Sequence, residues 1–304
     1  MALAGRHGFG AAAEAPDDTL SFWSQAIGDT GTNRGDAEVA ALSHQTAGVI
    51  FGGDVGGLDV PGGTARLGAA GGYLHDNFDV DERASSGRVD SVFAALYGSA
   101  AYGPVQLSAG AAYSRNTTRL DRRIVFPGFG EAAASEGHGT TAQAFGEAGY
   151  RFDLAAPALG GLPLGHAWLQ PFAGGAVVHL HQDGFGEDGG LAALSALAAS
   201  QDVATTTLGL RAEAALSGAL PLTARTMLGW RHAYGDAAPT AALAFQGGSP
   251  FTVEGAAGNR DAFVAEASLD YALTTNAAIG VAYAGQFGRT ATDNTFSAFL
   301  KVQF

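Results

Sequence analysis

The sequence of 304 residues contains no cysteine and a single lysine, Lys301. Without cysteine there is no disulfide framework, no thiol nucleophile and no cysteine-ligated zinc centre. Charged residues make up only 15% of the chain, whereas a typical soluble domain has roughly 25%. No apolar stretch reaches the 18 or more residues that a transmembrane helix needs. A membrane-spanning interpretation must therefore use strands, which need only about 9–11 residues each.

Positive charge is also scarce, because the formal net charge is −13. The one local group of cations lies at residues 119–123, where three arginines flank Asp121. Phosphate contacts dominate nucleic-acid affinity and need a basic surface, so we expect no nucleic-acid partner. Residues 1–6 lack the apolar run of a signal peptide. An outer-membrane protein requires such a signal, so the membrane interpretation predicts that this chain comes from a longer precursor.

Long segments alternate apolar and polar residues with period two, which is the pattern of a β-strand. Between Leu222 and Tyr234, leucine, tryptophan and tyrosine occupy one face, while Arg225 and Arg231 occupy the other. The segment from Ala142 to Phe152 places alanines opposite glutamine, glutamate and arginine. A soluble core would favour isoleucine, leucine, valine and phenylalanine. Alanine- and glycine-rich faces with aromatic residues near the strand ends instead indicate a lipid-facing band around a polar lumen.

We therefore predict an all-β protein, a transmembrane antiparallel β-barrel of about twelve strands. The strands should centre near Trp23, Phe51, Ala70, Ala94, Ala109, Ala144, Val177, Leu208, Leu228, Phe263, Val281 and Phe299. The polar residues that we expect to face the lumen are Gln143, Glu147, Arg151, Arg211, Glu213, Arg225, Arg231, Glu266 and Asp270. Such charges either hydrate a passage for a moving chain or pair across strands and stiffen the wall, and both roles can hold together.

The connections predict two kinds of loop and a separate N-terminal segment. Short turns should alternate with long outer loops. We expect long loops at Leu120 to Gly137, Gly184 to Gln201 and Asp236 to Pro250, and a turn of middling length at Gly56 to Gly63. Residues 1–18 are rich in glycine and include Pro16, so they predict a linker or the remnant of a lumen-threading segment. Residues 19–304 form the predicted barrel domain.

Gly184 to Gly189 matches the dinucleotide-binding pattern G-x-G-x-x-G, and a helical-looking run follows at residues 191–199. The glycines of that pattern bring backbone close to a pyrophosphate at a helix N-terminus. Here Glu187 and Asp188 would place two negative charges where the phosphate must lie. We therefore interpret the segment as an outer loop without a cofactor.

His179 and His181 lie on one face of a predicted strand, with Asp183 two residues further on. Two imidazoles and a carboxylate could bind a metal ion, but the sequence identifies no further partner. We therefore expect a pair of wall histidines and no metal site. The sequence also lacks a G-x-S-x-G nucleophile elbow and a phosphate-binding loop of the G-x-x-x-x-G-K type, so we expect no enzyme activity and no cofactor.

The chain ends in an alternating segment, residues 293–304, that stops on a phenylalanine. The apolar residues on one face of that segment are Phe296, Leu300, Val302 and Phe304. This ending resembles the C-terminal signal that outer-membrane barrels present to the barrel-assembly machinery. We expect these four residues to form such an assembly signal.

Other segments resemble the C-terminal translocator domain of autotransporters, the type V secretion family. They are Phe22-Trp23, Leu169-Gln170-Pro171-Phe172, Gly229-Trp230-Arg231-His232, Arg260-Asp261-Ala262 and Ala282-Tyr283-Ala284-Gly285. The resemblance covers residues 19–304, nearly the whole chain. It implies a twelve-stranded barrel in the outer membrane of a Gram-negative bacterium. It also implies partners: outer-membrane lipid and lipopolysaccharide, the barrel-assembly machinery, and the protein's own N-terminal passenger polypeptide.

The leading hypothesis is thus a monomeric outer-membrane pore that translocates or anchors a passenger polypeptide. A second hypothesis is an outer-membrane barrel that acts as a small-solute channel or an adhesin, and a third is a soluble all-β enzyme or lectin-like domain. A passenger encoded upstream in the same reading frame would favour the first. A signal peptide directly before residue 1 would favour the second, and solubility in plain buffer the third.

Overall fold

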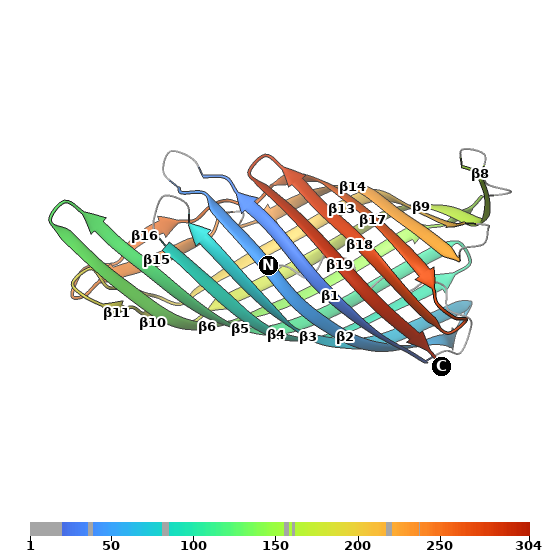
Figure 1. Ribbon diagram of the computed structural model, residues 1–304, viewed down its shortest axis with the longest axis horizontal. Helices are drawn as coiled ribbons and strands as arrows, with labels where there is room; N and C mark the ends of the chain where they lie inside the picture. The colour runs from blue at the N-terminus through green and yellow to red at the C-terminus, as the bar shows by residue number, and fades with distance from the viewer. Residues whose placement is uncertain are drawn as a thin grey trace.

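Twelve long strands enclose a lumen in the computed structural model, which describes residues 20–35, 39–80, 85–154, 158–159, 162–216, 221–236 and 238–304 (Figure 1). These strands are β1 (Leu20–Asn33), β2 (Leu42–Val60), β3 (Gly63–Val80), β4 (Ser85–Tyr102), β5 (Val105–Phe126), β6 (Phe129–Tyr150), β9 (Leu162–Gln182), β13 (Ala199–Leu216), β14 (Leu222–Gly235), β17 (Asp261–Ala272), β18 (Ala277–Gly288) and β19 (Ala291–Gln303). Each predicted strand centre lies within one of them, so the predicted all-β barrel of twelve strands is confirmed.

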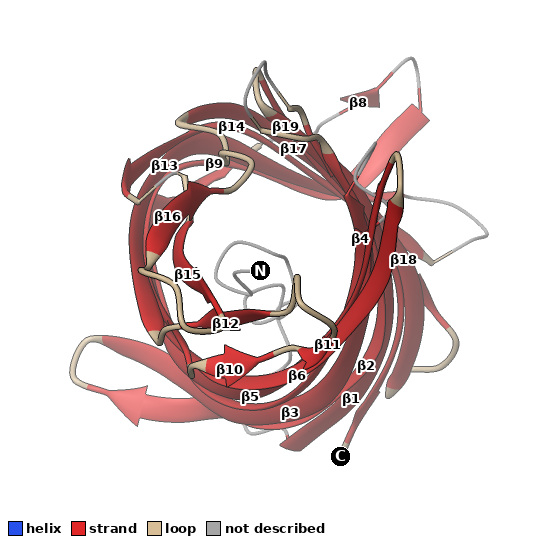
Figure 2. Cartoon of the chain, turned by 90° about the vertical axis from the view of Figure 1, so that its left-hand side faces the viewer, coloured by secondary structure: helices blue, strands red, loops and turns tan. Residues whose placement is uncertain are grey.

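Each barrel strand pairs antiparallel with its neighbours in chain order, and the sheet closes on itself (Figure 2). The closing seam joins the first strand to the last, from Ser21 opposite Gln303 to Asn33 opposite Ala291. Closure gives every barrel strand a partner on both sides, which is the condition for placing strands in hydrocarbon. The last strand, which carries Phe304 just beyond its end, thus lies beside the strand that contains Trp23.

The alternation in the sequence becomes an alternation of exposure along the strands. On β14, Leu228 and Trp230 are exposed, whereas Met227, directly before Leu228, is buried. On β6, Gln143 is buried while Ala142 and Ala144 on either side are exposed. Successive side chains of a strand point to opposite faces of the sheet, so one face of the barrel wall is covered and the other is open.

Two predicted loops are tight turns instead. The loop expected at 120–137 does not exist, because β5 continues to Phe126 and β6 starts at Phe129. Likewise β2 and β3 run into the segment 56–63 and leave only two residues between them. Each turn is a Pro-Gly pair, and its glycine has a φ of +85°. Proline followed by a glycine with positive φ is the sequence signature of a type II turn, so the pairs mark hairpin tips.

The remaining strands are short: β7 (Phe152–Asp153), β8 (Ala158–Leu159), β10 (Phe185–Gly186), β11 (Asp188–Gly189), β12 (Leu194–Ala196), β15 (Thr240–Phe245) and β16 (Phe251–Glu254). A separate four-stranded sheet pairs β10, β12, β15 and β16 in that order. Seen down the barrel, β12 and β15 lie within the ring of strands (Figure 2). The helical-looking run at 191–199 is therefore not a helix but contains β12.

We call the end of the barrel with this four-stranded sheet the loop end, and the end with the C-terminus the turn end (Figure 1). No helix of the described residues is long and apolar enough to cross a membrane. The predicted N-terminal segment, residues 1–18, lies outside the described residues.

Candidate functional site: the wall of the barrel lumen

The covered and open faces of the wall are reversed relative to a soluble protein. Large apolar side chains lie on the open face, and Leu96 and Val92 are 69% and 62% exposed there. Polar side chains lie on the covered face, where Ser21 and Gln143 are buried. Because the barrel is closed, the covered face is the concave one that lines the lumen. An exterior of this kind suits a hydrocarbon environment, and in water it would form an apolar patch far larger than monomers tolerate.

A first group of lumenal charges joins β6 and β13 across the strand between them. The Arg211 guanidinium donates to both carboxylate oxygens of Glu147, over 2.7 and 3.1 Å. Its cationic carbon also lies 4.5 Å from the centre of the Phe172 ring on β9. Gly174 lies opposite Glu147 on that intervening strand and offers no side chain to obstruct the pair. The predicted residues Arg211 and Glu147 therefore form a fork-shaped ion pair inside the barrel.

A second group centres on Arg225 of β14, which contacts two carboxylates. It donates to Glu213 over 2.5 Å and also pairs with Asp270. All three side chains are about seven-eighths covered, at 13–14% exposure. Glu213 also accepts from the Trp168 indole N–H over 3.1 Å, while Oδ1 of Asp270 has no hydrogen-bond partner among the residues that the structure describes. Arg225 is thus the counter-ion on which Asp270 depends.

The other predicted lumen residues are spread along the wall. Arg231 donates to the hydroxyl of Thr207 over 3.2 Å and to the side-chain oxygen of Gln286 over 2.8 Å. Arg151 lies at the turn end, where it donates to Asp153 over 3.0 Å and stacks 4.9 Å from the Trp168 ring centre. Glu266 lies on β17, opposite Met227 of β14 and on the same face as Asp270. The structure therefore brings the predicted residues together in clusters and not in one continuous ring.

A third cluster near the turn end was missed in the sequence. Arg66 of β3 pairs with Asp54 of β2, and both side chains are nine-tenths covered or more. The Tyr97 hydroxyl donates to Asp54 over 2.9 Å and accepts from the Trp23 indole N–H over 2.8 Å. Asp54 and Arg66 flank the segment that the sequence analysis treated as a turn, so their strand positions were not assigned. Their spacing of twelve residues about the Pro-Gly pair was the available signal.

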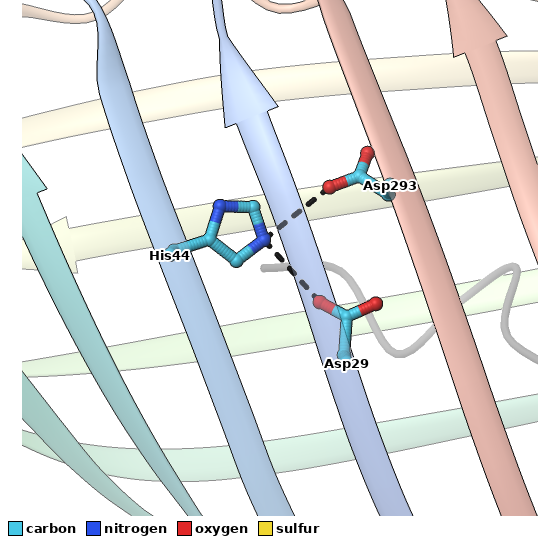
Figure 3. A group of neighbouring side chains, drawn as sticks. All are labelled: Asp29, His44 and Asp293. Atoms are coloured by element: carbon cyan, nitrogen blue, oxygen red, sulfur yellow. Dashed lines mark ion pairs between the residues drawn. The ribbon is translucent and has the colours of Figure 1, made fainter.

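A fourth cluster lies on the seam, where three side chains from β1, β2 and β19 point toward one another (Figure 3). Nε2 of His44 on β2 lies 3.3 Å from Oδ1 of Asp29 on β1 and 3.3 Å from Oδ1 of Asp293 on β19. His44 and Asp293 lie on either side of Gly31 in the strand register. No metal ligand was predicted from the sequence, but the nitrogen and oxygen atoms of these three residues lie within 4.8 Å of one another, so the group is a candidate metal site within the described residues.

The loop end is tied to the inner face of the β5–β6 hairpin. The carboxylate of Glu187 accepts from Arg122 over 3.0 and 2.5 Å and from the backbone N–H of Leu194. Glu131 accepts from the backbone N–H groups of Leu191 and Ala192. Glu187 belongs to the G-x-G-x-x-G pattern, and in the structure its carboxylate is paired with an arginine. The loop that carries β10 to β12 is thereby fixed over the lumen mouth.

The two histidines of the H-x-H pattern have different partners on the outer face. Nδ1 of His179 lies 2.7 Å from a carboxylate oxygen of Asp202, and Nε2 of His181 lies 3.4 Å from one of Asp183. The structure therefore does not bring both imidazoles to one point. The C-terminal residues also lie outward: Phe296, Leu300 and Phe304 are exposed, and Val302 pairs with Phe22 across the seam.

Chemically, the lumen wall offers charges that already have partners. In the three ion-pair clusters, each arginine lies against at least one carboxylate of a neighbouring or next-neighbouring strand. Paired charges still hydrate a passage, since their remaining carboxylate lone pairs accept hydrogen bonds from water and their remaining N–H groups donate to it. The arginines of these clusters attract a passing polypeptide only weakly, because each one already lies against a carboxylate.

Comparisons with known proteins give a consistent result. The family model described as "Autotransporter beta-domain" matches residues 22–284. Two extracellular serine proteases of Serratia marcescens are each 28% identical to the chain over 290 and 293 residues, which is 94% of this chain but 26% of theirs. The chain thus spans about a quarter of the length of these curated relatives.

Solved structures share the fold. The translocator domain of the autotransporter NalP from Neisseria meningitidis has a TM-score of 0.72 at 14% identity, with 94% of this chain and 88% of that chain covered. The transport unit of the autotransporter AIDA-I from Escherichia coli has a TM-score of 0.72 at 16% identity, with 99% and 93% covered.

Proposed function

Because the chain belongs to the autotransporter β-domain family, we propose that it is the outer-membrane pore through which an N-terminal passenger polypeptide is exported or on which it is anchored. The observation that carries this proposal is the reversal of the two faces: exposed leucine, valine and aromatic side chains outside, and covered, paired charges inside. Lipid can solvate the first face and water the second.

The proposed mechanism is passive. The closed sheet satisfies its own backbone hydrogen bonds, and the paired lumenal charges keep a hydrated route for an unfolded chain. The protease activity in the names of the two relatives belongs to those proteins. We assign no reaction to the barrel. Residues 1–18 would act as the linker between passenger and barrel, and residues 19–304 as the translocator domain. The remaining partners follow from this role: outer-membrane lipid and lipopolysaccharide, and the barrel-assembly machinery that would recognise Phe296, Leu300, Val302 and Phe304.

The test is to fuse a signal peptide and a small reporter domain to residue 1 and express the fusion in a Gram-negative host. We expect the reporter to become accessible to added protease on intact cells, while the barrel fractionates with the outer membrane. A matched control carries Leu210→Arg, which should lower the amount of inserted barrel and leave correspondingly more reporter inside the cell. A reporter that stays in the periplasm while the wild-type barrel is folded in the outer membrane would refute the proposal and favour a small-solute channel.

A further inference from the structure

We propose that Asp29, His44 and Asp293 form a binding site for one divalent transition-metal ion of the zinc class, on the lumenal side of the closing seam (Figure 3). The inference uses only the geometry of the barrel wall and does not rest on the proposed export function. The three side chains come from the second, first and last barrel strands, so a bound ion would join the two ends of the sheet.

The donor atoms match the bond lengths of such an ion. Zinc lies about 2.0–2.1 Å from imidazole nitrogen and about 2.0–2.2 Å from carboxylate oxygen. Two tetrahedral ligands at those distances are separated by about 3.4 Å. Nε2 of His44 lies 3.3 Å from Oδ1 of Asp29 and from Oδ1 of Asp293, and all three donor atoms lie within 4.8 Å of one another. The ion therefore needs little rearrangement to enter.

The wall also leaves room for these side chains to converge. Gly31 lies between His44 and Asp293 in the strand register, and its missing side chain is the space they share. A Cβ atom there would lie 2.4 Å from the Cε1 atom of His44 and 2.4 Å from Oδ1 of Asp293. Atoms cannot approach so closely, so even alanine at this position would push the two donors apart. Glycine is thus a requirement of the cluster.

One ligand is held in orientation from outside the cluster. The hydroxyl of Thr295 donates to Oδ2 of Asp29 over 2.7 Å, which turns Oδ1 toward His44. Outer hydrogen bonds of this kind commonly fix metal-binding carboxylates. The side chain of Asp29 is fully covered, while those of His44 and Asp293 are 13% and 23% exposed. The open side therefore faces the lumen, where water can supply the fourth ligand.

The donor set indicates the class of ion. An imidazole with two carboxylates suits zinc, cobalt, nickel or copper, whereas magnesium and calcium favour sites made only of oxygen. A neutral imidazole and two carboxylates carry a charge of −2, which a divalent cation neutralises. In the alternative state no metal is bound, and a proton on Nε2 makes His44 an imidazolium between the two carboxylates. These two states give opposite results in the following experiment.

The experiment uses the folded 304-residue protein in detergent, stripped of metal with a chelator and then titrated with Co²⁺ as a spectroscopic probe. We expect one equivalent to bind with the strong visible absorption of tetrahedral cobalt, and Zn²⁺ to displace it. His44→Gln and Asp293→Asn should each weaken binding roughly 100-fold or more, since even outer-shell changes cost 10–100-fold. Gly31→Ala, which retains all three ligands, should weaken it at least tenfold.

The matched control is His75→Gln, because Nδ1 of His75 lies 2.7 Å from Asp90 in a similar pair on the outer face. This variant should bind Co²⁺ as the wild type does. Each variant is first shown to be folded by its faster migration on a gel before heating, and Asp293→Asn replaces His44→Gln if the latter fails. The proposal is overturned if the folded wild type binds no cobalt, as the imidazolium state requires, or binds it no better than the folded ligand variants do.

Discussion

Removing the guanidinium of Arg225 should destabilise the barrel strongly, because this side chain is the counter-ion of two carboxylates. In Arg225→Gln, the carboxylates of Glu213 and Asp270 would lose the cation between them while their side chains stay 13% exposed. Glu213 keeps the Trp168 N–H as a donor, but Asp270 keeps no comparable partner, since its Oδ1 already has none. The summed charge of the three side chains changes from −1 to −2 at a place that water reaches only in part.

The magnitude follows from the burial of the pair. Breaking a buried ion pair by removing one partner costs about 3–5 kcal/mol. Because water in the lumen reaches part of the cluster, the lower end applies, about 3 kcal/mol. The second variant, Arg225→Gln with Asp270→Asn, restores the local charge to −1 and removes the stranded carboxylate. It should recover most of the loss, which a purely steric role of the arginine would not allow.

The assay is urea unfolding of the folded protein in detergent, followed by the gel migration of the unheated sample and by intrinsic tryptophan fluorescence. The free energy of unfolding of Arg225→Gln should be about 3 kcal/mol below the wild type. A loss below about 0.5 kcal/mol would mean that the cluster behaves like an exposed surface pair. Equal losses in the single and double variants would mean that charge is not the cause.

Three further predictions concern the outer face, the C-terminus and the loop end. Leu210→Arg should cost about 2–4 kcal/mol in the same assay if Leu210 faces the middle of the bilayer, whereas Ser108→Arg, directly opposite Glu147 on the lumenal face, should be nearly neutral. Equal costs would contradict the assignment of faces. Deleting Phe304 removes an apolar side chain worth roughly 1.5–3 kcal/mol and should lower the outer-membrane yield more than the unfolding temperature of the inserted fraction; an unchanged yield would refute the assembly signal. Glu187→Gln weakens the charge-assisted contact with Arg122, which is worth about 1.5–3 kcal/mol. Chymotrypsin should therefore cleave the loop that carries β10 to β12 roughly tenfold faster or more. An unchanged rate would show that Arg122 does not hold the loop.

The strands could be predicted from the sequence because each carries its own signal. Alternation along a strand is a local pattern. The face on which Arg225 or Glu213 lies follows from counting along its own strand and does not require the neighbouring strand to be known. The ends of the hairpins were less accessible. Polar, glycine-rich sequence around residues 120–137 resembles a loop, but outside the membrane a strand no longer needs apolar residues. The Pro-Gly pair inside it was the better indicator of the turn.

The seam cluster could not be predicted in the same way. His44 and Asp29 are fifteen residues apart, and Asp293 lies 264 residues beyond Asp29, so no spacing rule connects them. Only the register of β1 against both β2 and β19 brings them to one point. The arginine clusters share this dependence on register: residue types indicated the face, whereas the partners required the closed sheet.

The pairing of the first strand with the last has a consequence for how the molecule folds. Hairpins such as β5–β6 and β17–β18 close over two to four residues, but Ser21 must find Gln303 across nearly the whole chain. Loop closure of that length costs about 4 kcal/mol more entropy than a hairpin does, and it yields nothing until the last strand exists. The seam should therefore form last and set the folding rate. The closed ring also slows unfolding. To open it at the seam, all thirteen residue pairs between β1 and β19 must break before either strand can leave the sheet. The barrel should therefore unfold slowly, and its lifetime is a kinetic property separate from its equilibrium stability.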